Sequence, residues 1–118
     1  MSNDEKTDKT AGQVDEVWDD WQDAVNMTAS ELEKWLDTEE SRSVGQKDGG
    51  HESIGHQSGR HIVKILRSKK SELGDADAAH MHKVVGYVAR HSKQRPSGDV
   101  AETPWRYSLM NWGHDPLK

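Results

Sequence analysis

The residues best suited to chemistry are nine cations in the middle of the chain. Residues 60–95 carry nine Lys and Arg side chains against three Asp and Glu, whereas residues 1–59 carry five against fifteen. The net charge of −5 for the whole chain hides this basic segment. Clustered cations favour a polyanion, because phosphate contacts release condensed counterions. The candidate DNA-binding residues are Arg60, Lys64, Arg67, Lys69, Lys70, Lys83, Arg90, Lys93 and Arg95.

The spacing of these cations predicts contacts with phosphates rather than with bases. Arg60, Lys64 and Arg67 follow an i, i+4, i+7 course along one side of an expected helix. The next expected helix offers few side chains of the types that read base edges. We therefore expect binding to double-stranded DNA with low sequence specificity. In the alternative interpretation, the same cations form a solvated face or pair with acidic residues of the same domain.

Other chemistries have weaker support. The histidine pairs His51–His56 and His80–His82 lack the i, i+4 spacing that places two imidazoles on one metal. The stretch His56-Gln57-Ser58, with Ser53 and Glu52, could be imagined as a nucleophile with its base, but nothing orients such a group. The glycine-rich segment does not end in the Gly-Lys-Ser/Thr of a phosphate-binding loop. The absence of cysteine excludes thiolate zinc sites, iron–sulfur clusters and cysteine catalysis. Because no strong catalytic motif is present, we expect no enzyme, cofactor or metal site, and a hydrolase or metal enzyme is a third possibility.

The elements that position the cations are all expected to be helices. Apolar residues recur at helical spacing over several stretches, and these predict an all-α fold: a small bundle of four main helices plus a short C-terminal helix. The four main helices are expected at about 14–26, 28–40, 58–73 and 76–92. The last two are expected to form a helical hairpin, or alternatively a helix-turn-helix, over about 58–92. The domain is expected to span 14–118 with a Gly/Ser/His-rich loop at 43–58, after a disordered tail at 1–13.

Local signals support the helix boundaries. Thr28 and Glu31 have the spacing of a capping box. Gly74 is expected to end the third helix in a left-handed conformation, with the next residue capping the fourth. Thr103 followed by Pro104 predicts the start of the short last helix.

The five tryptophans are interpreted mainly as core residues. The chain has no Phe, so Trp must supply the bulk of the core. We expect Trp18, Trp21, Trp35 and Trp105 to be buried. Trp112, near the end of the chain, is expected to be the one most open to a surface role.

Long stretches of the chain resemble a known but uncharacterised family. The stretches are MTASELEKWLDTEESRSVGQKDGG, ESIGHQSGRHIVKIL, MHKVVGYVARH and QRPSGDV with TPWRYSLMNWGHDPLK. Over roughly residues 18–118 they are similar to the domain of unknown function numbered 3140. The resemblance implies a small soluble protein, of a kind often labelled DNA-binding without a defined site, and it supplies no catalytic residues.

The sequence therefore predicts a non-enzymatic DNA-binding protein. No stretch has the length or apolar character of a membrane span or a signal peptide. We expect a cytoplasmic protein, associated with the nucleoid if it binds DNA. The alternative is a protein–protein interaction or self-association module without a nucleic-acid role. In that module the acidic helix of one subunit would pair with the basic hairpin of another, as in a homodimer.

Overall fold

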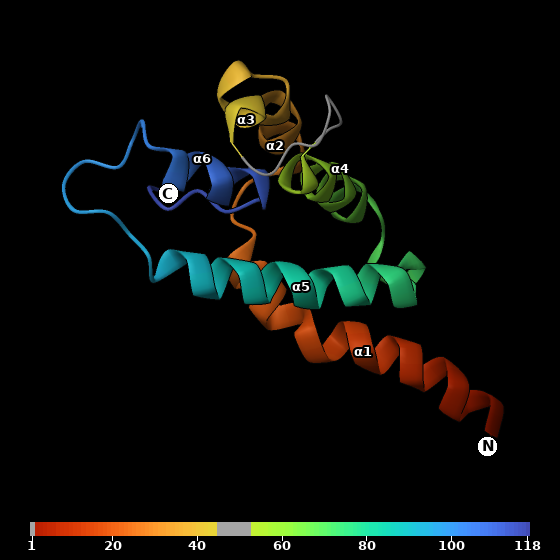
Figure 1. The fold of residues 1–118 in the computed structure, drawn as a ribbon. Helices are drawn as coiled ribbons and strands as arrows, with labels where there is room; N and C mark the ends of the chain where they lie inside the picture. Colours follow the sequence, from red (N-terminus) through yellow and green to blue (C-terminus); the bar gives the residue numbers. More distant parts are fainter. Residues whose placement is uncertain (1, 45–52) are drawn as a thin grey trace.

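The described part of the chain is entirely helical. The computed structural model describes residues 2–44 and 53–118, with side chains from residue 13 onward. Within these ranges it contains no strand (Figure 1). The expected all-α bundle is therefore confirmed. Its elements are α1 (Ser2–Ala24), α2 (Ala29–Leu36), α3 (Glu39–Ser43), α4 (Ile54–Arg67), the 3-10 turn η1 (Lys70–Glu72), α5 (Asp75–Ser92) and α6 (Pro104–Asn111).

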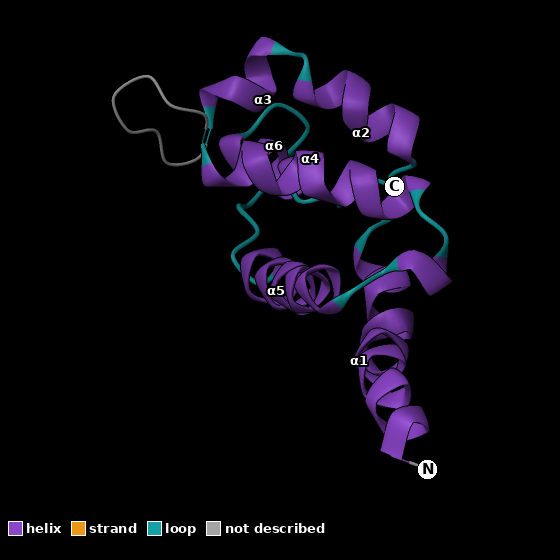
Figure 2. Cartoon of the chain, turned by 90° about the vertical axis from the view of Figure 1, so that its right-hand side faces the viewer, coloured by secondary structure: helices purple, strands orange, loops and turns teal. Residues whose placement is uncertain are grey.

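The fold is built from two pairs of packed helices, and α6 contacts both pairs. α1 packs along α5, α2 packs along α4, and α6 contacts α2, α3, α4 and α5. Figure 1 shows α5 in side view with α4 nearly end-on, and Figure 2 shows the reverse. The two helices of the expected hairpin are thus consecutive but cross steeply, instead of lying along each other. Their contact is confined to the crossing point.

One apolar core joins these helices. Its fully buried side chains include Leu32, Ile62, Met81 and Leu109, which come from α2, α4, α5 and α6 in turn. Burial of such side chains is the main favourable contribution to folding. Each of the four helices therefore depends on the others for the burial of its apolar face.

The tryptophans are used as expected, with one exception. Trp21 and Trp105 are buried, and Trp18 and Trp35 are partly buried against the core. Trp112 was expected to be open to the surface, but only 6% of it is exposed. It is buried because the chain turns back after α6 and carries it against α5.

Two helix starts match the local signals. In the capping box of α2, the N–H of Glu31 donates to the hydroxyl of Thr28, and the N–H of Thr28 donates to the carboxylate of Glu31. At α6, the N–H of Arg106 donates to the hydroxyl of Thr103, and Pro104 occupies the first helical position. These contacts are confined to one helical turn, so the local sequence is sufficient to specify them.

The third expected helix is shifted along the chain. It was expected at 58–73 but spans Ile54–Arg67, with the hydroxyl of Ser53 accepting the N–H of His56 as N-cap. The expected loop at 43–58 is shorter in the structure, because residues 54–58 belong to α4. Residues 45–52 of the expected loop lie outside the described residues. The reason is packing: Gly55 lies against the segment after α6, where a Cβ would come within 3.3 Å of Trp112 Nε1. Glycine here permits close helix contact rather than a loop.

Three further boundaries differ from the prediction. The helix expected to reach residue 40 ends at Leu36, and Thr38 caps the separate helix α3. Gly74 is itself the N-cap of α5, with φ of −104°, and so does not adopt the expected left-handed conformation. Residues 2–13 were expected to be a disordered tail and belong to α1 in the structure. The first buried side chain described on α1 is Val14.

Candidate functional site

All nine predicted DNA-binding residues lie on the exterior. They follow the path of α4, the connecting turn, α5 and the segment after α5, which we call the α4–α5 cationic surface. Every one of these side chains belongs to an exposed residue: Arg60, Lys64 and Arg67 on α4, Lys69 and Lys70 in the turn, Lys83 and Arg90 on α5, and Lys93 and Arg95 beyond it.

Two of the cations pair with carboxylates of the first two helices. Arg67 donates two hydrogen bonds to Glu33 of α2, of 2.7 and 3.2 Å, and these bonds lower the pKa of Glu33. Lys70 Nζ lies 2.6 Å from Oδ1 of Asp15 on α1 and 4.8 Å from the centre of the Trp18 ring. Both ion pairs are exposed, and such pairs contribute little to stability. Either cation can therefore exchange its partner at low cost.

Five of the cations form no ion pair with the described part of the chain. They are Lys64, Lys69, Lys83, Arg90 and Lys93. Among the carboxylates described on α1, only Asp15 forms an ion pair with the cationic surface. Within the described residues, pairing with the acidic helix therefore involves one of the nine cations. Arg95 instead covers the ring of Trp105, 5.4 Å from its centre.

A polar cluster that the sequence did not predict lies at the α4–α5 crossing. Ser58 and His61 come from α4, and Asp77 and His80 come from α5. His61 Nε2 donates to Asp77 Oδ1 over 2.8 Å, and Ser58 Oγ shares a 2.8 Å hydrogen bond with His80 Nε2. The two imidazoles stack with ring centres 4.4 Å apart. Ser58 and His61 are three residues apart on α4, as are Asp77 and His80 on α5, so each helix carries its two residues on one face. This spacing is the sequence signal from which the cluster could have been predicted.

The surroundings lower the pKa values of two members of this cluster, His80 and Asp77. Burial, and then the charges of His61 and Lys83, lower the pKa of His80 to about 4. The hydrogen bond from His61 is the main cause that lowers the pKa of Asp77, with smaller contributions from the N–H of Gly74 and the charge of Lys64. At neutral pH the cluster therefore combines a neutral His80 with an ionised Asp77.

The cluster is one end of a column of stacked rings along α5. After His61 and His80, the column continues through Trp112, Tyr87, His91 and Trp105, with successive ring centres 4.2 to 6.4 Å apart. Three of these residues recur along one face of α5, so the helix presents them together to α4 and to the segment of α6. The column holds the α4–α5 crossing in a defined geometry.

The cluster lacks the arrangement of a nucleophile with an oriented base. The carboxylate of Asp77 bonds His61 and not His80, the histidine that contacts Ser58. A Ser–His–carboxylate relay needs the carboxylate on the histidine that contacts the serine. The Nε2 of His56 donates to the carbonyl oxygen of Leu36. In the described ranges, no group of three or more His, Asp or Glu side chains is placed to hold a metal ion.

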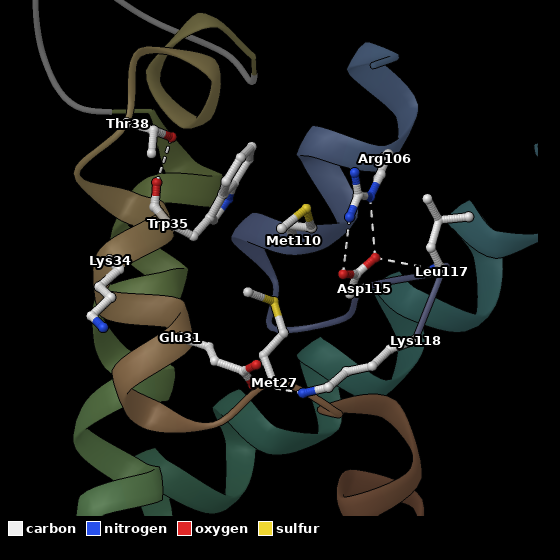
Figure 3. Close-up of a pocket in the computed structure, with 10 residues that line it drawn as sticks. All are labelled: Met27, Glu31, Lys34, Trp35, Thr38, Arg106, Met110, Asp115, Leu117 and Lys118. Atoms are coloured by element: carbon white, nitrogen blue, oxygen red, sulfur yellow. Dashed lines mark hydrogen bonds and ion pairs between the residues drawn. The ribbon is translucent and has the colours of Figure 1, made fainter. Parts of the chain in front are cut away.

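A separate open groove lies between α2, α6 and the C-terminal segment (Figure 3). It has a volume of about 550 Å³, and Met27, Trp35 and Met110 contribute apolar lining. Its ionic groups are largely paired with each other: Lys118 with Glu31 at 2.6 Å, and Arg106 with Asp115 at 3.1 Å. The groove therefore offers far less free positive charge than the α4–α5 cationic surface.

Comparison with known proteins gives one match. The model of the family described as protein of unknown function (DUF3140) matches residues 20–110. No significant match was found among curated proteins or solved structures. In the described part of the chain, none of the helices has the length and apolar character needed to cross a membrane.

Proposed function

The chain belongs to the DUF3140 family, whose function is unknown, and we propose that it binds the phosphate backbone of duplex DNA through the α4–α5 cationic surface. The observation that carries the proposal is the set of exposed cations without an ion pair in the described ranges: Lys64, Lys69, Lys83, Arg90 and Lys93. Each such ammonium or guanidinium is available to replace a counterion on a phosphate.

The distribution of carboxylates supports the same proposal. The acidic helix α1 packs along α5, yet its described ion pairing with the cationic surface is limited to Asp15 and Lys70. Lys83 and Arg90 are seven residues apart on α5 and share one face of it. A duplex approaching this face would meet Lys83 and Arg90 of α5, with Lys64 of α4 close to the crossing of the two helices. Because such contacts address the backbone, we propose low sequence specificity.

The test is the salt dependence of binding to a random duplex. Binding of the full chain to a fluorescently labelled duplex is followed by anisotropy over a series of salt concentrations. The variant Lys64→Gln/Lys83→Gln removes one cation from each helix. Because each phosphate contact contributes about 0.9 to the slope of log affinity against log salt, this variant should flatten the slope by about 2 units.

A charge-matched variant controls for nonspecific attraction. Lys34→Gln/Arg42→Gln removes two exposed cations from α2 and α3, away from the proposed surface. Its affinity should fall little and its slope should stay close to that of the unmodified chain. The proposal is wrong if the unmodified chain does not bind the duplex at low salt, or if the two variants weaken binding equally.

Self-association is a second candidate, favoured by the acidic face of α1. Its carboxylates Glu16, Asp19, Asp20 and Asp23 belong to exposed residues and form no ion pair within the described part of the chain. They could meet the cationic surface of a second copy. Sedimentation velocity at low and high salt separates the two functions. A dimer that dissociates in salt, together with no affinity for duplex, supports self-association.

A further inference from the structure

The α4–α5 crossing combines a titratable cluster with flanking cations. His61 donates its Nε2 proton to Asp77, and the structure shows no hydrogen bond from its Nδ1 to the described part of the chain. The side chain of His61 is 29% exposed. Lys64 on α4 and Lys83 on α5 are exposed and close enough to act electrostatically on Asp77 and His80. The cluster is therefore bordered by an ammonium group from each helix.

We propose that this crossing is a phosphodiester-binding subsite at which His61 takes up a proton as the polyanion binds. The inference rests on the proposed DNA binding and adds a specific site and its regulation by pH. A phosphate held between Lys64 and Lys83 brings a negative charge next to the ring, which favours its protonated form. Protonation at Nδ1 gives the ring a second N–H donor, directed to a phosphate oxygen, while Nε2 keeps its bond to Asp77.

The surrounding groups explain why His61 rather than His80 takes the proton. The charged and titratable groups around His61 are Lys64 on its own helix and Asp77, His80 and Lys83 on α5. Asp77 accepts the hydrogen bond of His61 Nε2, and a carboxylate beside a bound proton is electrostatically favourable. His80 has no carboxylate bond, and burial keeps it neutral down to about pH 4, as its lowered pKa indicates. Trp112, which directly follows α6, adds no charge to the cluster, and Glu33 of α2 pairs with Arg67 farther along α4.

The experiment compares duplex binding at two pH values with constant salt. Labelled random duplex is titrated at about pH 6 and about pH 8, a range within which histidine side chains commonly change charge. The full chain should bind roughly five- to tenfold more tightly at the lower pH, because binding and proton uptake are linked. His61→Gln should lose most of this difference in affinity between the two pH values.

The matched control is His82→Gln. His82 is exposed on α5 and takes no part in the cluster, so this variant should keep the full pH difference. If His61→Gln and His82→Gln show the same pH dependence as the unmodified chain, the inference is wrong while DNA binding stands. If the unmodified chain binds duplex at neither pH, the proposed function itself is wrong.

A second measurement does not depend on any variant. The ring resonances of His61 are followed by NMR during a pH titration, with and without duplex. With duplex present, the ring should become protonated at a higher pH than without it. An unchanged titration curve for His61 in the presence of bound duplex would overturn the inference.

Discussion

The indole nitrogen of Trp35 donates a 2.8 Å hydrogen bond to Oδ1 of Asn111, which joins α2 to α6. The hydroxyl of Ser41 donates to the same oxygen, and Asn111 Nδ2 donates to the carbonyl oxygen of Ser41 at 3.0 Å. Asn111 is only 1% exposed, so these bonds are shielded from water. One amide side chain therefore ties together α2, α3 and α6.

Replacing Asn111 should destabilise the fold strongly. Asn111→Ala removes all three bonds and leaves the N–H of Trp35 and the hydroxyl of Ser41 without a partner. The expected loss is about 3 kcal/mol in the free energy of unfolding, since each unsatisfied buried polar group costs about 1–3 kcal/mol. Urea denaturation followed by circular dichroism measures it. The control, Gln22→Ala on the exposed side of α1, should change stability by less than about 0.5 kcal/mol.

The same substitution at two glycines should have opposite effects. At Gly59 a Cβ would lie 2.6 Å from Leu36 Cδ2 and 2.7 Å from the carbonyl oxygen of Asn111. Gly59→Ala should therefore destabilise the fold by about 1–3 kcal/mol, the usual cost of overpacking. At Gly86 a Cβ would meet only the mobile end of Arg90, at 3.0 Å. Gly86→Ala should stabilise α5 by about 0.5–1 kcal/mol. Thermal unfolding of both variants checks the two signs.

The C-terminal segment should make stability sensitive to acid. Burial raises the pKa of Asp115, but the hydrogen bonds from Arg106 and from the N–H of Leu117 lower it. The lowering effects together outweigh burial, so the net shift of the pKa is downward. A carboxyl with a lowered pKa contributes stability above its unfolded value of about 4, and this contribution is lost as the pH falls through the folded value.

The variant Asp115→Asn tests this dependence. It should unfold at a lower temperature than the unmodified chain at neutral pH, and its melting temperature should fall less steeply below about pH 4. Asp20→Asn, on the exposed side of α1, is the control and should follow the unmodified chain. If the melting temperatures of Asp115→Asn and of the unmodified chain fall equally steeply in acid, the prediction is wrong.

The histidine cluster should affect stability at a higher pH. The pKa of His80 is lowered to about 4, first by burial and then by the charges of His61 and Lys83. In the unfolded chain a histidine titrates near about 6.5, so between these values the unfolded state binds more protons. Stability should therefore decrease as the pH falls from about 6.5 to about 4.

Melting temperatures at about pH 7 and about pH 5 measure this second dependence. His80→Gln keeps a polar group next to Ser58 and should show a smaller drop between the two pH values than the unmodified chain. Part of the drop should remain, because burial also lowers the pKa of His91. The exposed His82→Gln should behave like the unmodified chain. If His80→Gln shows the full drop, His80 is not its source.

Contacts within one helical turn were predictable from the sequence. The caps at Thr28 and Thr103 depend on residues three positions away, and both are present. The apolar face of α5, with Ala78, Met81 and Val84 buried, follows from helical periodicity alone. The exposure of the basic side chains was also expected, because charged side chains stay in water unless they are paired.

What the sequence determined by itself is the all-helical class, several helix starts and the position of the cations along the chain, because short-range contacts and periodicity specify them. Only the tertiary structure decided that Gly55 belongs to a helix, since its role depends on close contact with Asn111 and Trp112 from a distant part of the chain. It also decided that Ser58 meets His80 and His61 meets Asp77. Such pairings are set by the angle at which α4 crosses α5, and that angle results from the packing of the whole core.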